Sequence, residues 1–329
     1  MATSVLRIAA AQYMVEPLVT PQELSQKLEA WVAAAVEQGA RLLVFPEFSG
    51  MELASLSNRR RTASRRSPDR HTLGPLALAA PRRSEQPSLA WETEAVQEHL
   101  SDFLAIHSQL AAAHGVYILA GSIPVNVDAE IRNRAYFFAA DGKVGFQDKI
   151  VPTRWESDHW GISGGERISV FETAFGQIGI AICYDVEFPM VTRLQSEAGA
   201  RLLLSPCCCD SARGYHRVRV GARARALENQ AYVIQACTVG QSAWSGAIGE
   251  AIGTAAVFSP PDLGPNVNGV IAQSSGPEPQ WTYADLDMAA LDRLRLGKNI
   301  IANRDQWDAH LKFRDIQHAQ FEDWCAVKA

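Results

Sequence analysis

The stretch Gly176-Gln-Ile-Gly-Ile-Ala-Ile-Cys-Tyr-Asp-Val-Glu-Phe-Pro189 is the part of the sequence around which the fold is built. Its apolar run at 178–182 is rich in β-branched residues and too short to span a membrane, which is typical of a strand buried on both faces. Cys183 follows this strand at once, and Pro189 suits the first turn of a helix, where a missing N–H costs nothing. The stretch therefore predicts a strand, a sharp turn and a helix, with a thiol at the corner.

The position of Cys183 allows two interpretations. Free backbone N–H groups and the positive end of a helix would lower the pKa of the thiol and make it a nucleophile. A small apolar residue of the core is the ordinary role of a cysteine at the end of a strand. The choice depends on which other residues the fold brings to the same corner.

The composition of the 329-residue chain is that of an ordinary globular protein, with 47% hydrophobic and 20% charged residues. A net charge of −5 and an isoelectric point near 5.9 argue against binding to nucleic acids. Neither a signal peptide nor an apolar segment of membrane-spanning length is visible, so we expect a cytoplasmic protein without membrane contact.

The six cysteines predict free thiols. No CxxC pair occurs, and the three adjacent cysteines at 207–209 do not suit a disulfide framework. Structural zinc needs ligands spaced around a tetrahedron, and no Cys or His pair with the usual spacing lies nearby in the sequence. We therefore predict no metal site.

The N-terminal part of the chain predicts a layered α/β fold. A strand at 7–12, a helix that stops at Gly39 and a strand at 41–45 form a βαβ unit, which indicates a mostly parallel sheet. Further along, the pattern predicts one helix at 92–114 and a strand at 178–182 that reaches Cys183. No change in composition after residue 92 marks a boundary, so 1–329 is predicted to be a single domain.

An arginine-rich insert at about 55–90 interrupts this pattern. It combines eight arginines with several prolines and little periodicity, which predicts a surface loop or a partly disordered excursion. The lack of interleaved aromatic residues argues against a nucleic-acid patch. A lid over the site or an arm at an interface is the alternative, because long loops in compact domains are often functional.

Three predicted strands end in polar residues of catalytic type, namely Glu47, Lys149 and Cys183. In layered α/β folds ligands bind at the carboxyl ends of strands, so a shared sheet would place the three side chains in one crevice. They would supply a base, a cation for developing negative charge and a nucleophile. Taken singly, Glu47 is equally a loop carboxylate or a helix cap, and Lys149 a solvated lysine.

The residues around these strand ends resemble the nitrilase, or carbon–nitrogen hydrolase, superfamily. The resemblance covers the chain except for the arginine-rich insert and about the last twenty residues. It rests on these motifs: Phe45-Pro46-Glu47-Phe48; Asp148-Lys149-Ile150-Val151-Pro152-Thr153; Cys183-Tyr184-Asp185 with Phe188, Pro189 and Arg193; Gly199-Ala200 through Ser205-Pro206; Arg225-Ala226-Leu227-Glu228-Asn229-Gln230; Ala284-Asp285-Leu286-Asp287; and Asn303-Arg304.

The resemblance implies a four-layer α-β-β-α sandwich whose subunits pair through an outer helical layer, so we expect a homodimer or a higher homo-oligomer. It also implies a Glu–Lys–Cys triad, here Glu47, Lys149 and Cys183, and a further glutamate that positions the lysine and the substrate. Glu156 matches this glutamate best by motif position, and Glu166 is the weaker rival.

The chemistry implied by the resemblance proceeds through a thioester. Glu47 takes the thiol proton, Cys183 attacks a carbon bonded to nitrogen, and Lys149 with the backbone N–H of Tyr184 stabilises the oxyanion. Glu47 then protonates the leaving nitrogen and activates the water that cleaves the thioester. No metal or organic cofactor is needed for these steps.

Two motifs disagree about the substrate. Tyr184-Asp185 after the nucleophile resembles the amidase and carbamoylase branches, since true nitrilases typically carry Cys-Trp-Glu there. Residues 152–156 with Trp160-Gly161 instead resemble the corresponding nitrilase loop. We give more weight to the residues next to the nucleophile and expect a small amide or carbamoyl substrate, with a nitrile as the alternative. The whole pattern is closest to a poorly characterised bacterial branch of the superfamily.

We expect three further residues to contact the substrate. Tyr184 adjoins the nucleophile, Cys207 follows the strand end at Pro206, and Trp155 lies in the loop after the lysine. Two other function classes stay open: an acyltransferase that uses the same thioester in a water-excluding site, and a non-catalytic scaffold of the same fold. The intact Glu–Lys–Cys set argues against the scaffold.

Overall fold

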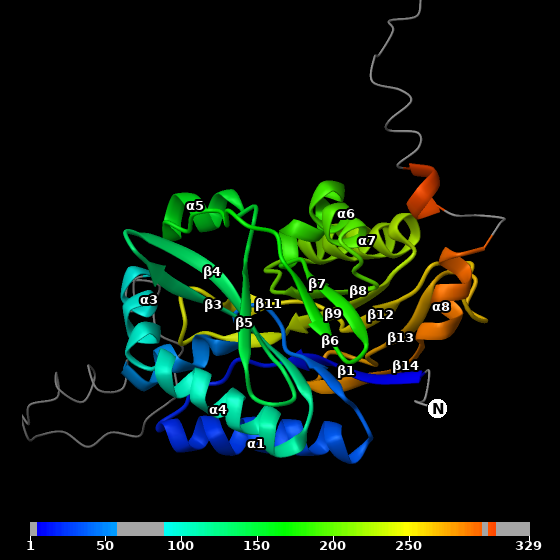
Figure 1. Ribbon diagram of the computed structural model, residues 1–329. Coiled ribbons are helices and arrows are strands. Elements are labelled where there is room, and N and C mark those ends of the chain that lie inside the picture. Colours follow the sequence, from blue (N-terminus) through cyan, green and yellow to red (C-terminus); the bar gives the residue numbers. More distant parts are fainter. Residues whose placement is uncertain (1–4, 58–88, 298–301, 307–329) are drawn as a thin grey trace, which may run out of the picture.

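Two halves of one sheet, joined between the strands β1 and β9, form the centre of the molecule (Figure 1). The computed structural model describes residues 5–57, 89–297 and 302–306, so most of the arginine-rich insert and the end of the chain lie outside the described residues. The strands have these bounds: β1 Val5–Tyr13, β2 Leu42–Val44, β3 Tyr117–Val127, β4 Glu130–Phe138, β5 Val144–Asp148, β6 Val170–Thr173, β7 Gly176–Ile180, β8 Leu202–Cys207, β9 Tyr232–Thr238, β10 Gly240–Ser242, β11 Gly249–Ala251, β12 Ala256–Phe258, β13 Val270–Gln273 and β14 Gln280–Asp287.

The sheet is mixed, so the expectation of a mostly parallel sheet is wrong. One half has the order β5-β4-β3-β2-β1-β14 and the other the order β6-β7-β8-β9-β12-β13. Strands β1 to β3 and strands β7 to β9 are parallel where helices connect them. Short turns join β3 to β4, β4 to β5 and β6 to β7, and strands joined in this way pair antiparallel.

The two halves face each other across an apolar core. β1 and β9 pair only through Gln12 with Cys237 and Tyr13 with Thr238, so the sheet turns sharply at this joint. At its far edges, Phe137 of β4 packs edge-on against Phe171 of β6, with ring centroids 5.4 Å apart. The core between the halves is therefore closed by side chains from both of them.

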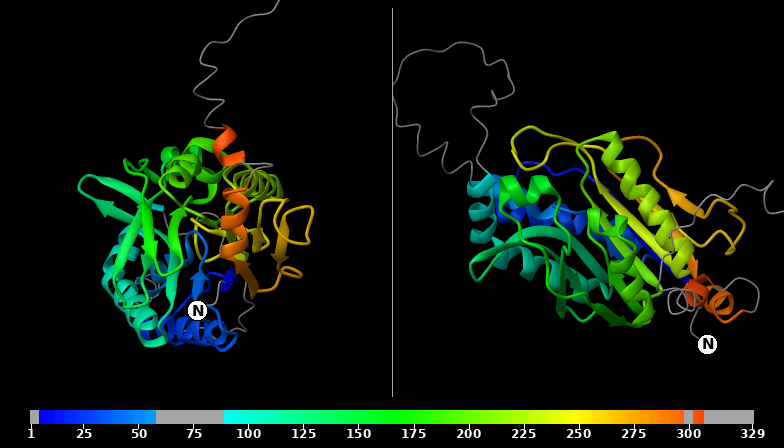
Figure 2. Two further views of the ribbon diagram at one scale, coloured as in Figure 1. Left: turned by 45° about the vertical axis from the view of Figure 1, so that its right-hand side comes forward. Right: turned by 90° about the horizontal axis from the view of Figure 1, so that it is seen from above.

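Helices cover the outer face of each half. Their bounds, with those of two short 3₁₀ turns, are: α1 Pro21–Glu37, η1 Ser49–Met51, α3 Leu89–Glu98, α4 Leu100–His114, α5 Arg154–Trp160, η3 Cys183–Glu187, α6 Pro189–Glu197, α7 Ala212–Asn229 and α8 Met288–Arg295. α1 and α4 lie on one side of the sheets, and α6 and α7 lie on the other, as Figures 1 and 2 show.

The side chains of β1 show how the layers arise. Ile8 and Ala10 point into the core between the two halves, whereas Ala9 and Ala11 point into the core beneath α1 and α4. Successive strand residues face opposite sides, so a strand without polar positions fits a sheet that is covered on both faces. This arrangement confirms the predicted α-β-β-α sandwich.

The local predictions fail at two places. The single helix expected at 92–114 is two helices, because the backbone of His99 leaves the helical conformation at ψ 10° and starts α4. The strand expected to reach Cys183 ends at Ile180. Within the described parts of the chain, no helix combines the length and apolar character that membrane crossing requires. The single-domain organisation of 1–329 stays a prediction.

Candidate active site

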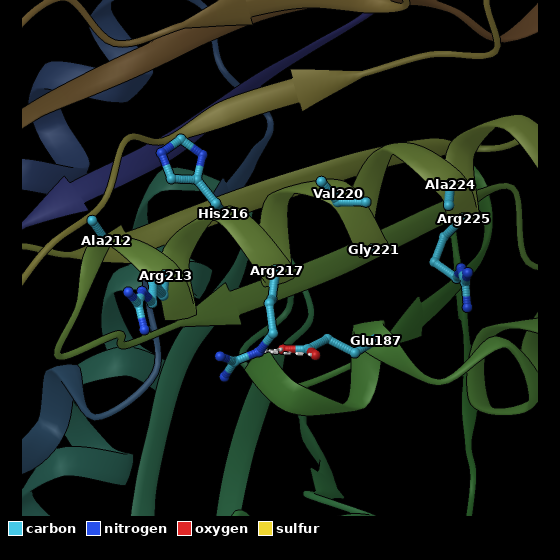
Figure 3. Close-up of a pocket in the computed structure, with 9 residues that line it drawn as sticks. All are labelled: Glu187, Ala212, Arg213, His216, Arg217, Val220, Gly221, Ala224 and Arg225. Atoms are coloured by element: carbon cyan, nitrogen blue, oxygen red, sulfur yellow. Dashed lines mark hydrogen bonds and ion pairs between the residues drawn. The ribbon is translucent and has the colours of Figure 1, made fainter.

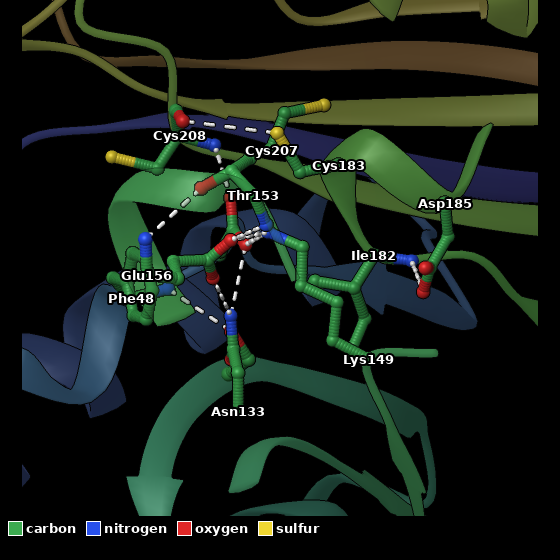
Figure 4. A network of polar contacts seen from close by, with 12 residues as sticks. Phe48, Asn133, Lys149, Thr153, Glu156, Ile182, Cys183, Asp185, Cys207 and Cys208 are labelled. Carbon is green, nitrogen blue, oxygen red and sulfur yellow. Dashed lines mark hydrogen bonds and ion pairs between the residues drawn. The ribbon is translucent and has the colours of Figure 1, made fainter. Parts of the chain in front are cut away.

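Glu47, Lys149 and Cys183 meet in the interior of the protein, although they are far apart in the sequence. Figure 4 shows the network of polar contacts around Lys149 and Cys183. Glu47 follows β2, Lys149 follows β5 directly, and Cys183 opens the turn after β7. Their exposed fractions are 1%, 1% and 6%. The Lys149 ammonium lies 2.8 Å from Oε1 of Glu47, so the base and the cation of the predicted triad form a buried ion pair.

Glu156 completes a set of two carboxylates around one ammonium. Its Oε2 lies 2.7 Å from Nζ of Lys149, and its side chain is 3% exposed. The same carboxylate accepts the N–H of Thr153, whose hydroxyl in turn accepts the N–H of Glu156. This capping box fixes the start of α5, and with it the position of the second carboxylate. The rival Glu166 has an 81% exposed side chain and pairs with Arg132 instead.

Asn133 on β4 is a residue that our sequence analysis missed. Its amide Nδ2 donates to Oε1 of Glu47 at 2.9 Å and to Oε1 of Glu156 at 3.1 Å, so it bridges the two carboxylates. Its backbone oxygen also accepts the N–H of Lys149. The sequence offers no signal for it, because Asn133 stands between Arg132 and Arg134 in a strand that is polar at this end, and no motif connects it to the other three.

The turn that presents Cys183 is strained and is held by Asp185. Cys183 has φ +47°, a left-handed conformation that side chains other than glycine seldom adopt. The Asp185 carboxylate accepts the N–H of Ile182 at 3.2 Å, and on the other side the N–H groups of Ile150 and Val151 at 3.1 and 2.8 Å. One buried carboxylate therefore joins the cysteine turn to the strand end that carries Lys149.

The electrostatics of the thiol differ from our expectation. A hydrogen bond with the Cys209 thiol, then burial, then the charge of Glu47 raise the pKa of Cys183 well above its ordinary value. The ammonium of Lys149 opposes this shift without reversing it. The prediction of a lowered pKa is therefore wrong, because the helix end and the free N–H groups are outweighed by a second thiol and by burial beside a carboxylate. The thiol of Cys183 is therefore neutral at rest, and a nucleophilic role would require a base.

Glu47 has the properties of such a base. Burial raises its pKa, and the charge of Glu156 adds to that effect against the opposing attraction of Lys149. Burial alone would lower the pKa of Lys149, but the two carboxylates raise it well above its ordinary value, so the ammonium stays charged. The backbone N–H of Cys208 donates to the other oxygen of Glu47 at 2.9 Å and orients it.

A cavity of about 590 Å³ opens onto this cluster. It is lined by these residues: Glu47, Phe48, Lys149, Thr153, Trp155, Glu156, Cys183, Cys208, Asp210, Arg217 and the consecutive residues 245–250. Within the described residues, no group of three or more His, Cys, Asp or Glu side chains is arranged to hold a metal ion.

The cavity includes some of the residues expected to contact substrate but not others. Trp155 lines it, as expected. Cys207 does not, because β8 turns its side chain into the core, where its thiol donates to the backbone oxygen of Ser205; Cys208 takes the place at the cavity. The ring of Tyr184 packs against Phe188 outside the lining, so the backbone N–H is the part of Tyr184 for which a role is still predicted.

A family model described as carbon-nitrogen hydrolase matches residues 7–295, most of the chain. The chain belongs to the carbon–nitrogen hydrolase family. Both the sandwich fold and the positions of the three strand ends agree with the resemblance given by the motifs.

Named relatives agree with this membership at low sequence identity. The chain is 29% identical over 317 residues to the probable hydrolase YhcX of Bacillus subtilis, which covers 96% of this chain and 55% of that protein. It is 31% identical over 197 residues to the omega-amidase NIT2 of Xenopus tropicalis, which covers 57% of this chain and 67% of that protein. The chain thus spans about half the length of the Bacillus subtilis relative.

A solved structure of an amidase from Nesterenkonia, a member of the nitrilase superfamily, shares the fold. It has a TM-score of 0.62 and 21% sequence identity, and the match covers 93% of this chain and 96% of the amidase. The fold of this chain is therefore that of the nitrilase superfamily.

Removing the charge of Glu156 is expected to impair catalysis at this candidate site. Glu156→Gln leaves Lys149 with one carboxylate partner, so the ammonium shifts and kcat/KM falls by about tenfold to a hundredfold. The matched control is Glu166→Gln, whose exposed carboxylate is remote from the cavity and whose kinetics should equal those of the wild type. Steady-state kinetics on a small amide compare the two, and equal losses in both variants would contradict the assignment of Glu156.

The stability of the protein should depend on pH through Asp185. Burial raises the pKa of Asp185 to about 7 from an ordinary value of 3.8, so the folded protein holds this proton while the unfolded chain has lost it. Raising the pH from about 4 to about 7 therefore lowers the contribution of Asp185 to stability. Asp185→Asn lowers Tm because one amide oxygen replaces two acceptors, but its deficit relative to the wild type should shrink as the pH rises from about 4 to about 7 and stay constant above that. Calorimetry at several pH values measures the difference in Tm between the variant and the wild type. A deficit that grows with pH would contradict the raised pKa of Asp185.

Proposed function

We propose that this hydrolase cleaves the carbon–nitrogen bond of a small amide or carbamoyl compound through a thioester on Cys183. The observation that carries the proposal is the buried contact of Glu47 with Lys149 beside the Cys183 thiol, at the floor of a cavity that admits a small molecule. The amidase and omega-amidase names of the relatives support an amide over a nitrile, which stays the alternative.

The first half of the reaction forms the thioester. The carboxylate of Glu47 takes the proton of the Cys183 thiol, and the sulfur attacks the amide carbon. The oxygen of the former carbonyl gains the negative charge, which the Lys149 ammonium and the backbone N–H of Tyr184 stabilise. Glu47 returns the proton to the nitrogen, the carbon–nitrogen bond breaks, and ammonia leaves.

The second half of the reaction releases the acid. Water enters where ammonia left, and Glu47 takes one of its protons while the oxygen attacks the thioester carbon. The carbon–sulfur bond breaks, Cys183 regains its proton, and the carboxylic acid departs. A strongly basic thiolate is a poor leaving group, so return of this proton by Glu47 matters for turnover. The raised pKa of Cys183 fits a role for Glu47 in both halves.

A structure of the Nesterenkonia amidase supports the covalent step. In a mutant of that enzyme, the acetamide moiety of fluoroacetamide is added covalently at the active-site cysteine. Cys183 of this chain is the cysteine that combines a strained turn, a carboxylate and an ammonium, and it is our candidate for the same chemistry.

Pairing of two copies through the outer helical layer is part of the proposal. Large apolar side chains stand exposed on α6 and α7: Met190 at 61%, Leu194 at 45%, Val220 at 66% and Leu227 at 49%. Val220 lies beside a groove that runs along α7 past Glu187 and Arg217 (Figure 3). Exposed apolar side chains gathered on neighbouring helices favour a protein–protein contact, and light scattering of the purified protein measures the pairing directly.

Substitution of the nucleophile tests the proposed function. Cys183→Ala should abolish ammonia release from small primary amides, with a loss of at least about a thousandfold, because no thioester can form. Cys237→Ala is the matched control, since its thiol is buried at 2% exposure outside the cavity lining, and it should keep wild-type activity. Ammonia is measured over a panel of amides and nitriles, and circular dichroism verifies folding. Equal ammonia release by Cys183→Ala would overturn the proposal, and release from nitriles alone would select the alternative.

A further inference from the structure

The hairpin formed by β10 and β11 supplies a large part of the cavity wall. Its tip and the start of β11 contribute six consecutive lining residues, 245–250. Over the described residues its two strands pair with each other and with no strand of the main sheet. A two-stranded hairpin is marginally stable by itself. The position of this wall must therefore be set by contacts outside the strand ladder.

Glu92 on α3 makes such a contact. Its side chain is 1% exposed, and its Oε1 accepts the N–H of Gly246 at 2.6 Å. Its Oε2 accepts the hydroxyl of Ser245 at 2.6 Å, while that hydroxyl oxygen accepts the N–H of Ile248 at 3.1 Å. The carboxylate of Glu92 therefore holds the hairpin tip at Ser245 and Gly246 directly, and at Ile248 through the fully buried hydroxyl of Ser245.

The next residue of α3 holds a second part of the wall. The hydroxyl oxygen of Thr93 accepts the indole N–H of Trp160, the last residue of α5, at 2.6 Å. α5 also carries Trp155 and Glu156, which line the cavity. The ring of Trp160 lies 5.0 Å from the ring of Phe48, another lining residue. Two adjacent residues of one helix thus hold two of the elements that line the cavity.

We propose that α3 is a clamp that sets the separation of α5 and the β10–β11 hairpin, and that Glu92 is the positioning residue through which it controls substrate binding. Glu92 does not touch the reacting atoms, so its loss should alter substrate binding more than the chemical step. Because the clamp defines the width of the entry, it should also influence which acyl groups are accepted. The kinetic part of this inference rests on the proposed amide hydrolysis.

The chemistry of the contact defines informative variants. Glu92→Gln keeps an oxygen that accepts the N–H of Gly246 and an amide group that donates to the Ser245 hydroxyl. Glu92→Ala removes both contacts and leaves a buried N–H without a partner, which favours a displaced tip. Glu98→Ala is the matched control, because Glu98 lies on the same helix and accepts a hydrogen bond from Ser57, away from the cavity.

The experiment joins kinetics with hydrogen–deuterium exchange on the full chain. In Glu92→Ala, KM for acetamide should rise by about tenfold while kcat changes by less than about threefold, and preference among amides of increasing acyl length should shift. Exchange at residues 243–250 should become faster. Glu92→Gln and Glu98→Ala should keep wild-type KM and wild-type exchange at 243–250, which separates positioning from a general loss of stability.

Two results would overturn the inference. One is a Glu92→Ala protein with wild-type exchange at 243–250, because the tip would then be held without Glu92. The other is faster exchange there with unchanged KM and acyl preference, because the tip would then not control substrate binding. A wild-type protein that hydrolyses no amide counts against the proposed function instead, and the rate of acrylamide addition to Cys183, measured by mass spectrometry in each variant, then replaces KM as the readout.

Discussion

The buried contact of one ammonium with two carboxylates is the constraint on which the rest of the site depends. Lys149 lies within 2.8 Å of Glu47 and 2.7 Å of Glu156, and all three side chains are almost completely withdrawn from water. Taking such charges out of water costs several kcal/mol for each ion unless the geometry and the additional hydrogen bonds are good. The surrounding polar groups meet this need: the amide of Asn133 bridges the two carboxylates, and backbone N–H groups of Thr153 and Cys208 donate to them. Burial, with the charge of Glu156, raises the pKa of Glu47. A hydrogen bond with the Cys209 thiol, with burial, raises the pKa of Cys183.

The fold supplies this geometry from separate strand ends. The carboxyl ends of β2 and β5 bring the carboxylate and the ammonium together in one half of the sheet, and β7 brings the cysteine turn from the other half. Asp185 links the two halves of the sheet next to the candidate site. Its carboxylate accepts backbone N–H groups from both the cysteine turn and the strand end beside Lys149. Phe48, which follows Glu47, and Cys183 both have positive φ angles, so backbone strain lies at two corners of the candidate site.

The sequence predicted the parts of the structure that depend on local pattern. Apolar runs that stop at Glu47, Lys149 and Cys183 indicated strand ends, and the layered sandwich followed from the motifs around them. The role of Glu92 and the bridge made by Asn133 were not predictable, because each depends on a partner that is distant in the chain and shares no spacing rule with it. The register of β8 decides which of Cys207 and Cys208 faces the cavity. The pKa of Cys183 depends on a second thiol, that of Cys209, which the fold brings close to it. The local sequence pattern therefore predicts the candidate residues of the site. Their pKa values and the walls of the cavity depend on tertiary packing.

Detection of the covalent intermediate tests the proposed thioester on Cys183. The wild-type protein is mixed with a small primary amide, quenched in acid during turnover, digested and analysed by mass spectrometry. The peptide containing Cys183 should gain the mass of the acyl group, and this adduct should disappear as the amide is consumed. Peptides containing Cys208 and Cys209 should stay unmodified. Turnover without any acyl adduct on Cys183, or with the adduct on a neighbouring thiol, would contradict the proposed thioester.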